Sequence, residues 1–501
     1  MNIIKSETNF EIPPISFAQY LSTEIQRTDK DAIALIKPDS DFQLTFSQFN
    51  KKCNKFSSAL VDLGVKETDV VVFYADNCID YAIALIGTIY LGLVFVPVPP
   101  AHGSLFELSQ QLTQCSATIL ICGSRQMKTT VMKMKDATEY CQSIEQLKLI
   151  VTLDEPEEEP SMKLWPCKAH SMKKILQMNL SESTLPQIPY FPVNDPANST
   201  FLICFTSGFT VVLLPSGDLE PLMANIEKYR ISVFTFSGNQ ARALATGDWE
   251  QRFNLKSLKY IRTGGSNVPE NLLLAIKEKF KVPLKQVYGS TEFFQAIRVR
   301  HPLDTWQCFR PGNVGVPGPN VELKIANLVT GEAMPALAQG EICLRGPACF
   351  TGYLNNEAAT RSTIDSDGFY HSGDIGFYNE DHCLFITDRI KELIKYKLYS
   401  LIPAEIEDFI SRHKAVAAVC IVGVPHSIEG SYIRAYVEVA PGKTLTEQQL
   451  IDYVSENMGS QKRLRAGVRF ISAMPQTLIG KIDRQHFKRL VKDELLTEIV
   501  E

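Results

Sequence analysis

Residues 205–217 read FTSGFTVVLLPSG, and this stretch decides how the fold continues. The apolar run Phe201–Phe205 predicts a β-strand, and Thr206–Gly208 behind it supply the N–H groups and hydroxyls of an anion-binding loop. Such a loop usually continues through glycines to a lysine, but here a second strand-like run, Val211–Leu214, follows almost at once. Parallel neighbours in one sheet need a crossover of about a dozen residues. The two runs therefore form a hairpin, lie in different sheets, or do not both form.

On either side of this stretch, β-branched runs alternate with helical periodicity, which is typical of α/β layers on parallel sheets. The uncharged stretch Tyr81–Val98 belongs to this pattern. We expect a buried helix that ends near Gly92 and then a buried strand, with no membrane span. The expected strands are Val70–Tyr74, Val94–Pro97, Thr118–Cys122, Ile231–Phe236, Leu258–Arg262 and Leu284–Tyr288, and the expected helices include Asn50–Leu63, Leu105–Leu112 and Glu270–Phe280.

The C-terminal third has a different pattern. Residues Val321–Gly346 alternate short strands with Gly and Pro turns, which predicts a small β subdomain, and a compact α+β unit is expected after Asp388. A chain of 501 residues is too long for one hydrophobic core. We therefore expect an α/β protein with a large N-terminal domain of layered sheets, residues 1–388, and a small α+β C-terminal domain, residues 389–501. 

Composition narrows the range of functions. A net charge of -5 without a long Lys/Arg run gives no reason to expect nucleic acid as a partner. The 12 cysteines include no Cys-x-x-Cys pair, so we expect reduced thiols, and the eight histidines lack a spacing such as His-Glu-x-x-His, so we expect no zinc site. Residues Met1–Pro13 do not resemble a signal peptide and the last residues are not Ser-Lys-Leu. We expect an intracellular protein, cytoplasmic or peroxisomal, of open oligomeric state.

Several polar residues and glycines stand at predicted strand ends, where α/β proteins place ligands. Glu292 follows the turn-like residues Tyr288–Thr291 and is otherwise an exposed loop carboxylate. Asp374, in HSGDIG, can accept two ribose hydroxyl protons or can simply cap a turn. Gly264 and Gly265 allow a planar base to approach the backbone, or form only a tight turn.

Seven segments form an ordered set of motifs along the chain: FTSG (Phe205–Gly208), TGGSNVP (Thr263–Pro269), VYGSTE (Val287–Glu292), GEICLRGPACFTGY (Gly340–Tyr353), YHSGDIG (Tyr370–Gly376), DRIKELIKYK (Asp388–Lys397) and PQTLIGKIDR (Pro475–Arg484). In this order, they resemble the adenylate-forming (ANL) superfamily of acyl-CoA synthetases, 4-coumarate–CoA ligases and beetle luciferases. The resemblance implies a C-terminal domain that moves about a hinge near Asp388–Lys391. It also implies an ATP-dependent carboxylate–CoA ligase that uses ATP, Mg²⁺ and coenzyme A on a small carboxylic acid.

The resemblance assigns roles to individual residues. It implies that Lys481 bridges the substrate carboxylate and the α-phosphate, that Glu292 helps to hold Mg²⁺, and that Lys395 is a candidate for the second, thiol-transfer step. His371 is expected to be structural. The implied nucleotide-binding set is Thr206, Ser207, Gly208, Gly264, Gly265, Gln286, Tyr288, Gly289, Ser290, Thr291, Asp374, Arg389 and Lys481.

The chain departs from the family pattern at three places. The glycines, proline and lysine expected after FTSG are missing, and the sequence from Thr210 resembles what the family shows several dozen residues later. We infer an internal deletion after Gly208 and expect weak or absent turnover. The alternative is a non-catalytic splice product or pseudoenzyme that binds nucleotide or a partner. Leu398 replaces a usual glycine, which puts thioester formation in doubt, and Val287 replaces a frequent glycine in the adenine slot.

Overall fold

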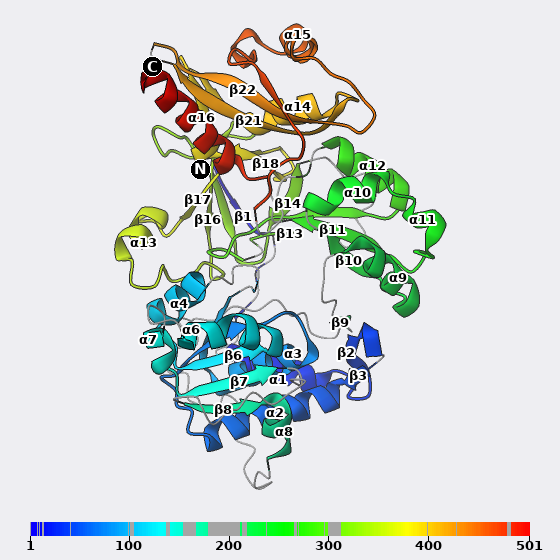
Figure 1. Ribbon diagram of the computed structural model, residues 1–501, viewed down its shortest axis with the longest axis vertical. Coiled ribbons are helices and arrows are strands. Elements are labelled where there is room, and N and C mark those ends of the chain that lie inside the picture. The colour runs from blue at the N-terminus through cyan, green and yellow to red at the C-terminus, as the bar shows by residue number, and fades with distance from the viewer. Residues whose placement is uncertain are drawn as a thin grey trace. The chain divides into compact units, whose positions relative to one another are not determined.

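The chain forms two compact units, Ile12–Asp218 and Met1–Glu11 with Leu219–Glu501 (Figure 1). Each unit is described below by itself. The computed structural model describes residues 2–7, 9, 11–12, 15–40, 42–98, 100, 105–136, 141–153, 167–178, 211–212, 218–236, 238–264, 268, 270–294, 296–298, 312–397, 399–426, 428–477 and 482–500.

The first unit is built on a five-stranded parallel sheet, of order β5-β4-β6-β7-β8. Its inner strands β6 and β7 are buried at every position, because helices cover both faces. The strand Val94–Pro97 was predicted to be buried, but it lies at the edge of the sheet and Val94 is 41% exposed. The strands are β4 (Val70–Tyr74), β5 (Val94–Pro97), β6 (Ile119–Gly123), β7 (Leu149–Leu153) and β8 (Lys168–Ser171). The helices are α1 (Phe17–Arg27), α2 (Phe46–Asp62), α3 (Ile79–Leu91), α4 (Leu105–Gln114), α5 (Ser124–Gln126), α6 (Met132–Asp136), α7 (Cys141–Glu145) and α8 (Met172–Gln177).

The run that follows residues 206–210 forms a strand in a small sheet, separate from the five-stranded sheet. Strand β9 (Val211–Val212) pairs in parallel with β2 (Ile33–Lys37), which also pairs with β3 (Phe42–Thr45). The described part of the predicted strand Val211–Leu214 is therefore confirmed. Its predicted neighbour Phe201–Phe205 lies outside the described residues, so the choice among the three arrangements stays open.

The other unit contains a three-stranded parallel sheet, of order β10-β11-β12. Apolar side chains from helices α9, α10 and α12 pack on this sheet and form one hydrophobic core. The strands are β10 (Val233–Phe236), β11 (Tyr260–Gly264) and β12 (Leu284–Val287), and the helices are α9 (Leu219–Tyr229), α10 (Ala241–Thr246), α11 (Trp249–Arg252) and α12 (Glu270–Phe280).

The predicted β subdomain is a seven-stranded antiparallel sheet, of order β1-β15-β16-β17-β18-β14-β13. Its edge strand β1 comes from the other end of the sequence. The strands are β1 (Ile3–Lys5), β13 (Ile297–Arg298), β14 (Asn313–Pro317), β15 (Glu322–Ala326), β16 (Gly340–Arg345), β17 (Tyr370–Tyr378) and β18 (Leu384–Arg389), with the short helix α13 (Glu357–Thr363) before β17.

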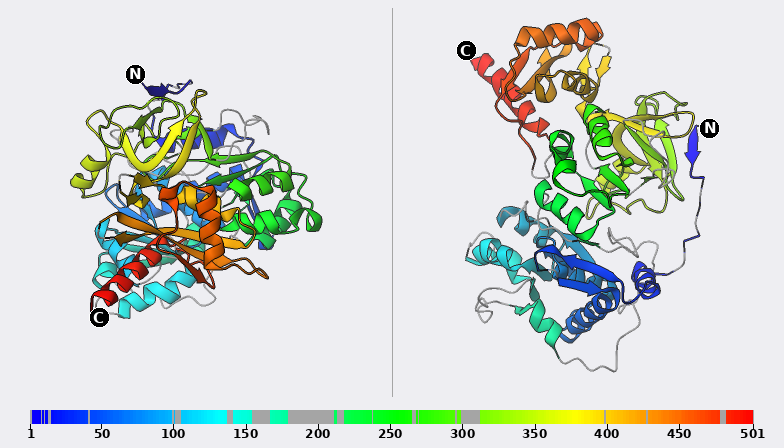
Figure 2. Two further views of the ribbon diagram at one scale, coloured as in Figure 1. Left: turned by 90° about the horizontal axis from the view of Figure 1, so that it is seen from above. Right: turned by 90° about the vertical axis from the view of Figure 1, so that its right-hand side faces the viewer.

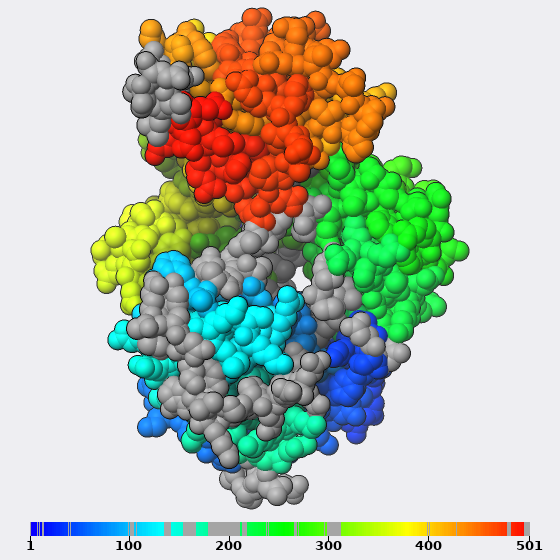
Figure 3. Space-filling model, in the orientation of Figure 1, coloured from blue at the N-terminus to red at the C-terminus, as the bar shows by residue number. Residues whose placement is uncertain are grey.

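The C-terminal part is the predicted α+β unit, and helix α16 packs on its sheet (Figure 2). Phe487 of α16 stacks on Tyr436 with ring centroids 4.3 Å apart. In the space-filling view, the red atoms of α16 form part of the visible surface of this part of the chain, beside the orange atoms of the segments that precede it (Figure 3). The elements are β19 (Ile394–Tyr396), β20 (Tyr399–Leu401), β21 (Val416–His426), β22 (Gly430–Val439), β23 (Val468–Ile471), α14 (Pro403–Ser411), α15 (Glu447–Asn457) and α16 (Arg484–Val500).

These elements confirm the α/β fold class with a small C-terminal α+β part. Among the described helices, none is both long enough and apolar enough to cross a bilayer. The boundary between residues 388 and 389 stays a prediction.

Candidate functional site

Three of the predicted nucleotide-binding residues form one hydrogen-bonded group. The Tyr288 hydroxyl, just beyond β12, donates to Asp374 Oδ2 at 2.7 Å. The Arg389 Nε, at the end of β18, lies 2.8 Å from Asp374 Oδ1. Asp374 on β17 is only 6% exposed, whereas half of the Arg389 side chain reaches solvent. The group is thus a buried carboxylate held by a neutral donor and a half-exposed cation.

The HSGD segment fixes the position of Asp374. Gly373 adopts a φ of 70°, a conformation that favours glycine, and its N–H donates to Glu341 Oε1 at 3.1 Å. The Ser372 hydroxyl donates to the Ile342 carbonyl at 2.7 Å and accepts from the Asp374 N–H at 3.1 Å. These bonds hold the segment to β16, so the Asp374 carboxylate is preorganised.

The tyrosines around Asp374 stay protonated at neutral pH. Burial raises the pKa of Tyr288 well above its ordinary value, and the neighbouring Asp374 carboxylate raises it further. Burial also raises the pKa of Tyr370 to about 12, and a hydrogen bond with Ser290, 3.0 Å away, opposes this rise. Both hydroxyls are therefore donors or acceptors in this site, not anions.

Glu292 lies beyond the same strand end and offers a half-buried carboxylate. Its Oε1 accepts from the Tyr353 hydroxyl at 2.9 Å. Burial and this carboxylate raise the pKa of Tyr353. Mg²⁺ is usually held by one or two carboxylates together with substrate phosphates. A single half-buried carboxylate fits that pattern, so Glu292 has the donor chemistry of such a protein ligand.

Other predicted residues have structural contacts of their own. Gln286 is buried, and its Oε1 accepts from the Gly312 N–H at 3.0 Å. At Gly264, a Cβ would lie 2.5 Å from Val287 Cγ2 and 2.9 Å from the Val287 carbonyl oxygen. Gly264 therefore has a packing reason to be glycine, and its contact with a base stays a prediction.

The remaining predicted residues are spread more widely. Gly289 and Thr291 are exposed beside Ser290 in the turn after β12, and Lys395 is exposed on β19, in a different sheet from Asp374. His371 bonds with Glu341 and Asp365, in accordance with its expected structural role. Residues Thr206, Ser207, Gly208, Gly265, Leu398 and Lys481 lie outside the described residues.

Sequence reasoning did not identify the residues that support the site. Tyr353, Ser372 and Glu341 position Glu292 and Asp374 through the bonds described above. Glu341 could have been recognised from the sequence. Its motif, GEICLRGPACFTGY, comes directly before the motif that contains HSGD, and alternate residues of a strand point to one face of the sheet. No sequence signal specified the Tyr353–Glu292 bond, which joins residues of different elements.

Comparisons with known proteins define the class of this chain. The family model for the AMP-binding enzyme matches residues 22–210 and 167–354, and that for the AMP-binding enzyme C-terminal domain matches residues 405–481. The chain therefore belongs to the AMP-binding enzyme family. The predicted adenylate-forming superfamily is confirmed.

Relatives are found among luciferases and ligases. The chain is 28% identical to luciferin 4-monooxygenase of Luciola mingrelica, over 92% of each chain. It is 34% identical to probable 4-coumarate–CoA ligase 2 of Dictyostelium discoideum over 62% of this chain, but spans only 55% of that relative. The fold resembles the anthranilate CoA ligase AuaEII in complex with anthranoyl-AMP, with a TM-score of 0.79 at 20% identity, covering 96% of this chain and 98% of the other.

Proposed function

We propose that this chain derives from ATP-dependent carboxylate–CoA ligases and that it binds ATP around Asp374. The observation that supports this most strongly is the buried Asp374 carboxylate, which is anchored by Tyr288 and Arg389. Each carboxylate oxygen has two lone pairs, so Asp374 can accept from a ribose diol while it keeps both protein contacts.

The proposed first step joins a carboxylic acid to the nucleotide. A substrate carboxylate oxygen attacks the α-phosphorus of ATP, the bond to the β-phosphate oxygen breaks, and pyrophosphate leaves. Lys481 would stabilise the negative charge between the two reactants, and Glu292 would hold the Mg²⁺ that offsets phosphate charge. In the second step, the coenzyme A thiol would displace AMP from the acyl carbon, with Lys395 as the candidate residue on the C-terminal part.

The shortened loop favours impaired turnover. The match to the Luciola relative extends over 516 aligned positions, more than the 501 residues of this chain. That relative therefore has positions between matched segments which this chain lacks, in agreement with a deletion after Gly208. Each lost charge-assisted phosphate contact costs about 1.5–3 kcal/mol. The second candidate function is thus nucleotide binding without turnover.

Carboxylate-dependent ATP–pyrophosphate exchange separates these two functions. We expect exchange far below that of a relative with the complete loop, measured alongside with a panel of aromatic and aliphatic acids. ATP with Mg²⁺ should nevertheless raise the melting temperature, because a ligand that binds the folded chain stabilises it. Exchange at the rate of the complete relative would contradict impairment, and no thermal shift would contradict nucleotide binding.

A further inference from the structure

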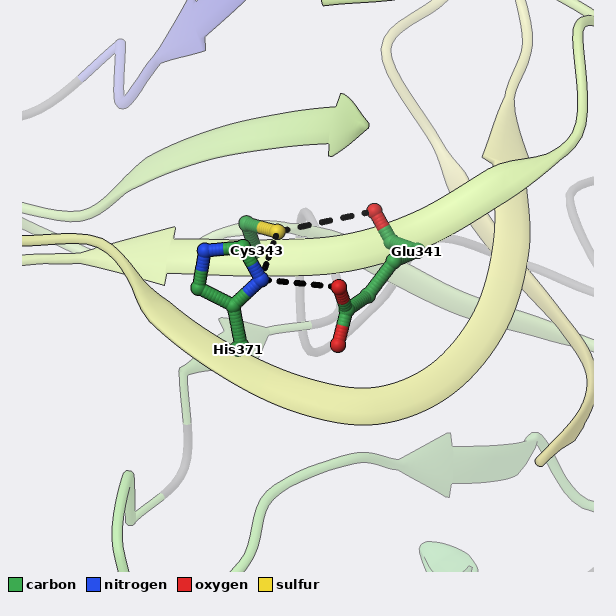
Figure 4. Close-up of side chains that lie close together, drawn as sticks. All are labelled: Glu341, Cys343 and His371. Carbon is green, nitrogen blue, oxygen red and sulfur yellow. Dashed lines mark hydrogen bonds and ion pairs between the residues drawn. The ribbon is translucent and has the colours of Figure 1, made fainter. Parts of the chain in front are cut away.

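Three side chains with metal-binding atoms meet between β16 and β17 (Figure 4). Glu341 and Cys343 are two residues apart on β16 and therefore share a face, and His371 on β17 is the cross-strand partner of Cys343. Their donor atoms all lie within 4.8 Å of one another. The His371 Nδ1 is 3.6 Å from Cys343 Sγ and 2.7 Å from Glu341 Oε2.

We propose that Glu341, Cys343 and His371 bind a zinc-class divalent metal ion, contrary to the expectation from histidine spacing that the chain has no zinc site. A thiolate, an imidazole and a carboxylate suit a borderline-soft ion such as Zn²⁺ or Co²⁺, whereas Mg²⁺ and Ca²⁺ prefer oxygen ligands. Ligand atoms on a tetrahedral Zn²⁺ are about 3.5 Å apart, close to the observed distance from sulfur to nitrogen. The shorter distance, between His371 Nδ1 and Glu341 Oε2, is that of a hydrogen bond, which the metal ion would replace.

Surrounding residues already provide the outer contacts of such a site. The other ring nitrogen of His371, Nε2, lies 3.3 Å from Asp365 Oδ2. A metal-bound histidine typically donates its second N–H to a carboxylate in this way. The second oxygen of Glu341 accepts from the Gly373 N–H. Both ligands are thus oriented before an ion arrives, which lowers the cost of assembling the site.

The charges also balance with an ion present. A thiolate and the Glu341 carboxylate neutralise two positive charges, while Lys324 Nζ pairs with Asp365 Oδ2 at 3.4 Å. Burial raises the pKa of the Cys343 thiol to about 12, so an entering ion must displace its proton. Cys343 is fully buried, whereas the side chains of His371 and Glu341 are 29% and 16% exposed, so solvent reaches two of the three ligands.

Cobalt titration of the reduced, chelator-treated full-length chain tests this site. We expect one Co²⁺ per chain with a near-ultraviolet thiolate-to-cobalt band, which Zn²⁺ then abolishes by displacement. Cys343→Ser should remove the band, and His371→Gln should weaken binding by about tenfold or more. Cys349→Ser is the matched control, because Cys349 is a half-buried free thiol in the same region, and it should leave the titration unchanged.

The outcomes are decisive even if one variant misfolds. Absence of the band in the folded wild type, or its persistence in Cys343→Ser, would overturn the proposal. If circular dichroism shows that Cys343→Ser is unfolded, the surface-accessible His371→Gln decides instead, and unchanged cobalt affinity in that variant would also overturn it. The titration is independent of ATP, so its failure says nothing about the proposed ligase function.

Discussion

Asp374 shows how a single residue defines the candidate site. Its carboxylate is nearly buried yet bonded on both oxygens, by a tyrosine held neutral and by an arginine that remains half exposed. The motif HSGD identified this residue from sequence, because the chemistry of ribose recognition favours a carboxylate there. Its partner Tyr288 lies 86 residues earlier in the chain, just beyond β12, so their direct bond could not be read from local sequence.

Gly264 provides a test of packing at the residue scale. Gly264→Ala places a methyl group 2.5 Å from Val287 Cγ2, and we expect it to lower stability by about 1–3 kcal/mol through overpacking. Adding Val287→Ala should recover only part of this loss, because the Val287 carbonyl oxygen remains 2.9 Å away. Urea denaturation of the single and double variants measures both effects. Full stability of Gly264→Ala would show that the backbone adjusts freely.

The sequence predicted well those helices whose ends are set by nearby residues. Helix α12 has the predicted bounds, Glu270–Phe280, and helix α3 ends as expected before Gly92, whose φ of 76° is a left-handed helix cap. Pairing between distant segments was not predicted. Strand β1 pairs with β15, and β9 pairs with β2, through backbone hydrogen bonds. These strands are too short for a periodic sequence pattern that would predict the pairing. Long-range pairing therefore limits what sequence alone can establish.

Asp69 connects elements of the first unit and gives a pH-dependent prediction. Its carboxylate accepts from Lys148 Nζ at 2.7 Å, from the Lys66 N–H at 2.8 Å and from the Thr118 hydroxyl at 2.8 Å. Burial alone would raise the pKa of Asp69, but these contacts outweigh it and lower the pKa. Because the unfolded pKa is about 3.9, the stabilisation is present above that pH and is lost as the pH falls toward the folded-state value.

Asp69→Asn should therefore cost about 1.5–3 kcal/mol at pH 7, and the difference from wild type should shrink at pH 3. Urea denaturation at both pH values measures this. The exposed Glu67→Gln, two residues away, is the matched control and should have little effect at pH 7. A loss in Asp69→Asn that is equally large at pH 3 would contradict the assigned role of the ionised carboxylate.

At the scale of the whole molecule, a hydrogen bond and an ion pair join the predicted hinge segment to the C-terminal helices. Asp388 Oδ2 accepts from the Ala404 N–H at 2.9 Å, and Lys488 Nζ lies 2.6 Å from Glu392 Oε2. The sequence predicted a hinge here only through the family resemblance. Rotation about it stays a prediction, as does the arrival of Lys481 at the nucleotide.

Restoring the missing loop tests the deletion directly. We expect a chain that carries the corresponding segment of a relative between Gly208 and Phe209 to gain pyrophosphate exchange, because the added glycines and lysine would contact the phosphates. Wild type measured in parallel gives the baseline. An insert of equal length with its lysine changed to alanine is the control and should gain less. If the restored chain folds but gains no exchange, the missing segment does not limit adenylation, and that result would contradict the deletion account.

The central claim, that Asp374 recognises the nucleotide, is tested most directly by isothermal titration of ATP with Mg²⁺. Asp374→Asn keeps the size of the side chain but removes its charge, and Asp381→Asn changes an exposed carboxylate in the turn that follows β17. We predict that wild type and Asp381→Asn bind ATP equally and that Asp374→Asn binds roughly tenfold or more weakly. Equal ATP affinity of Asp374→Asn and wild type would contradict the claim.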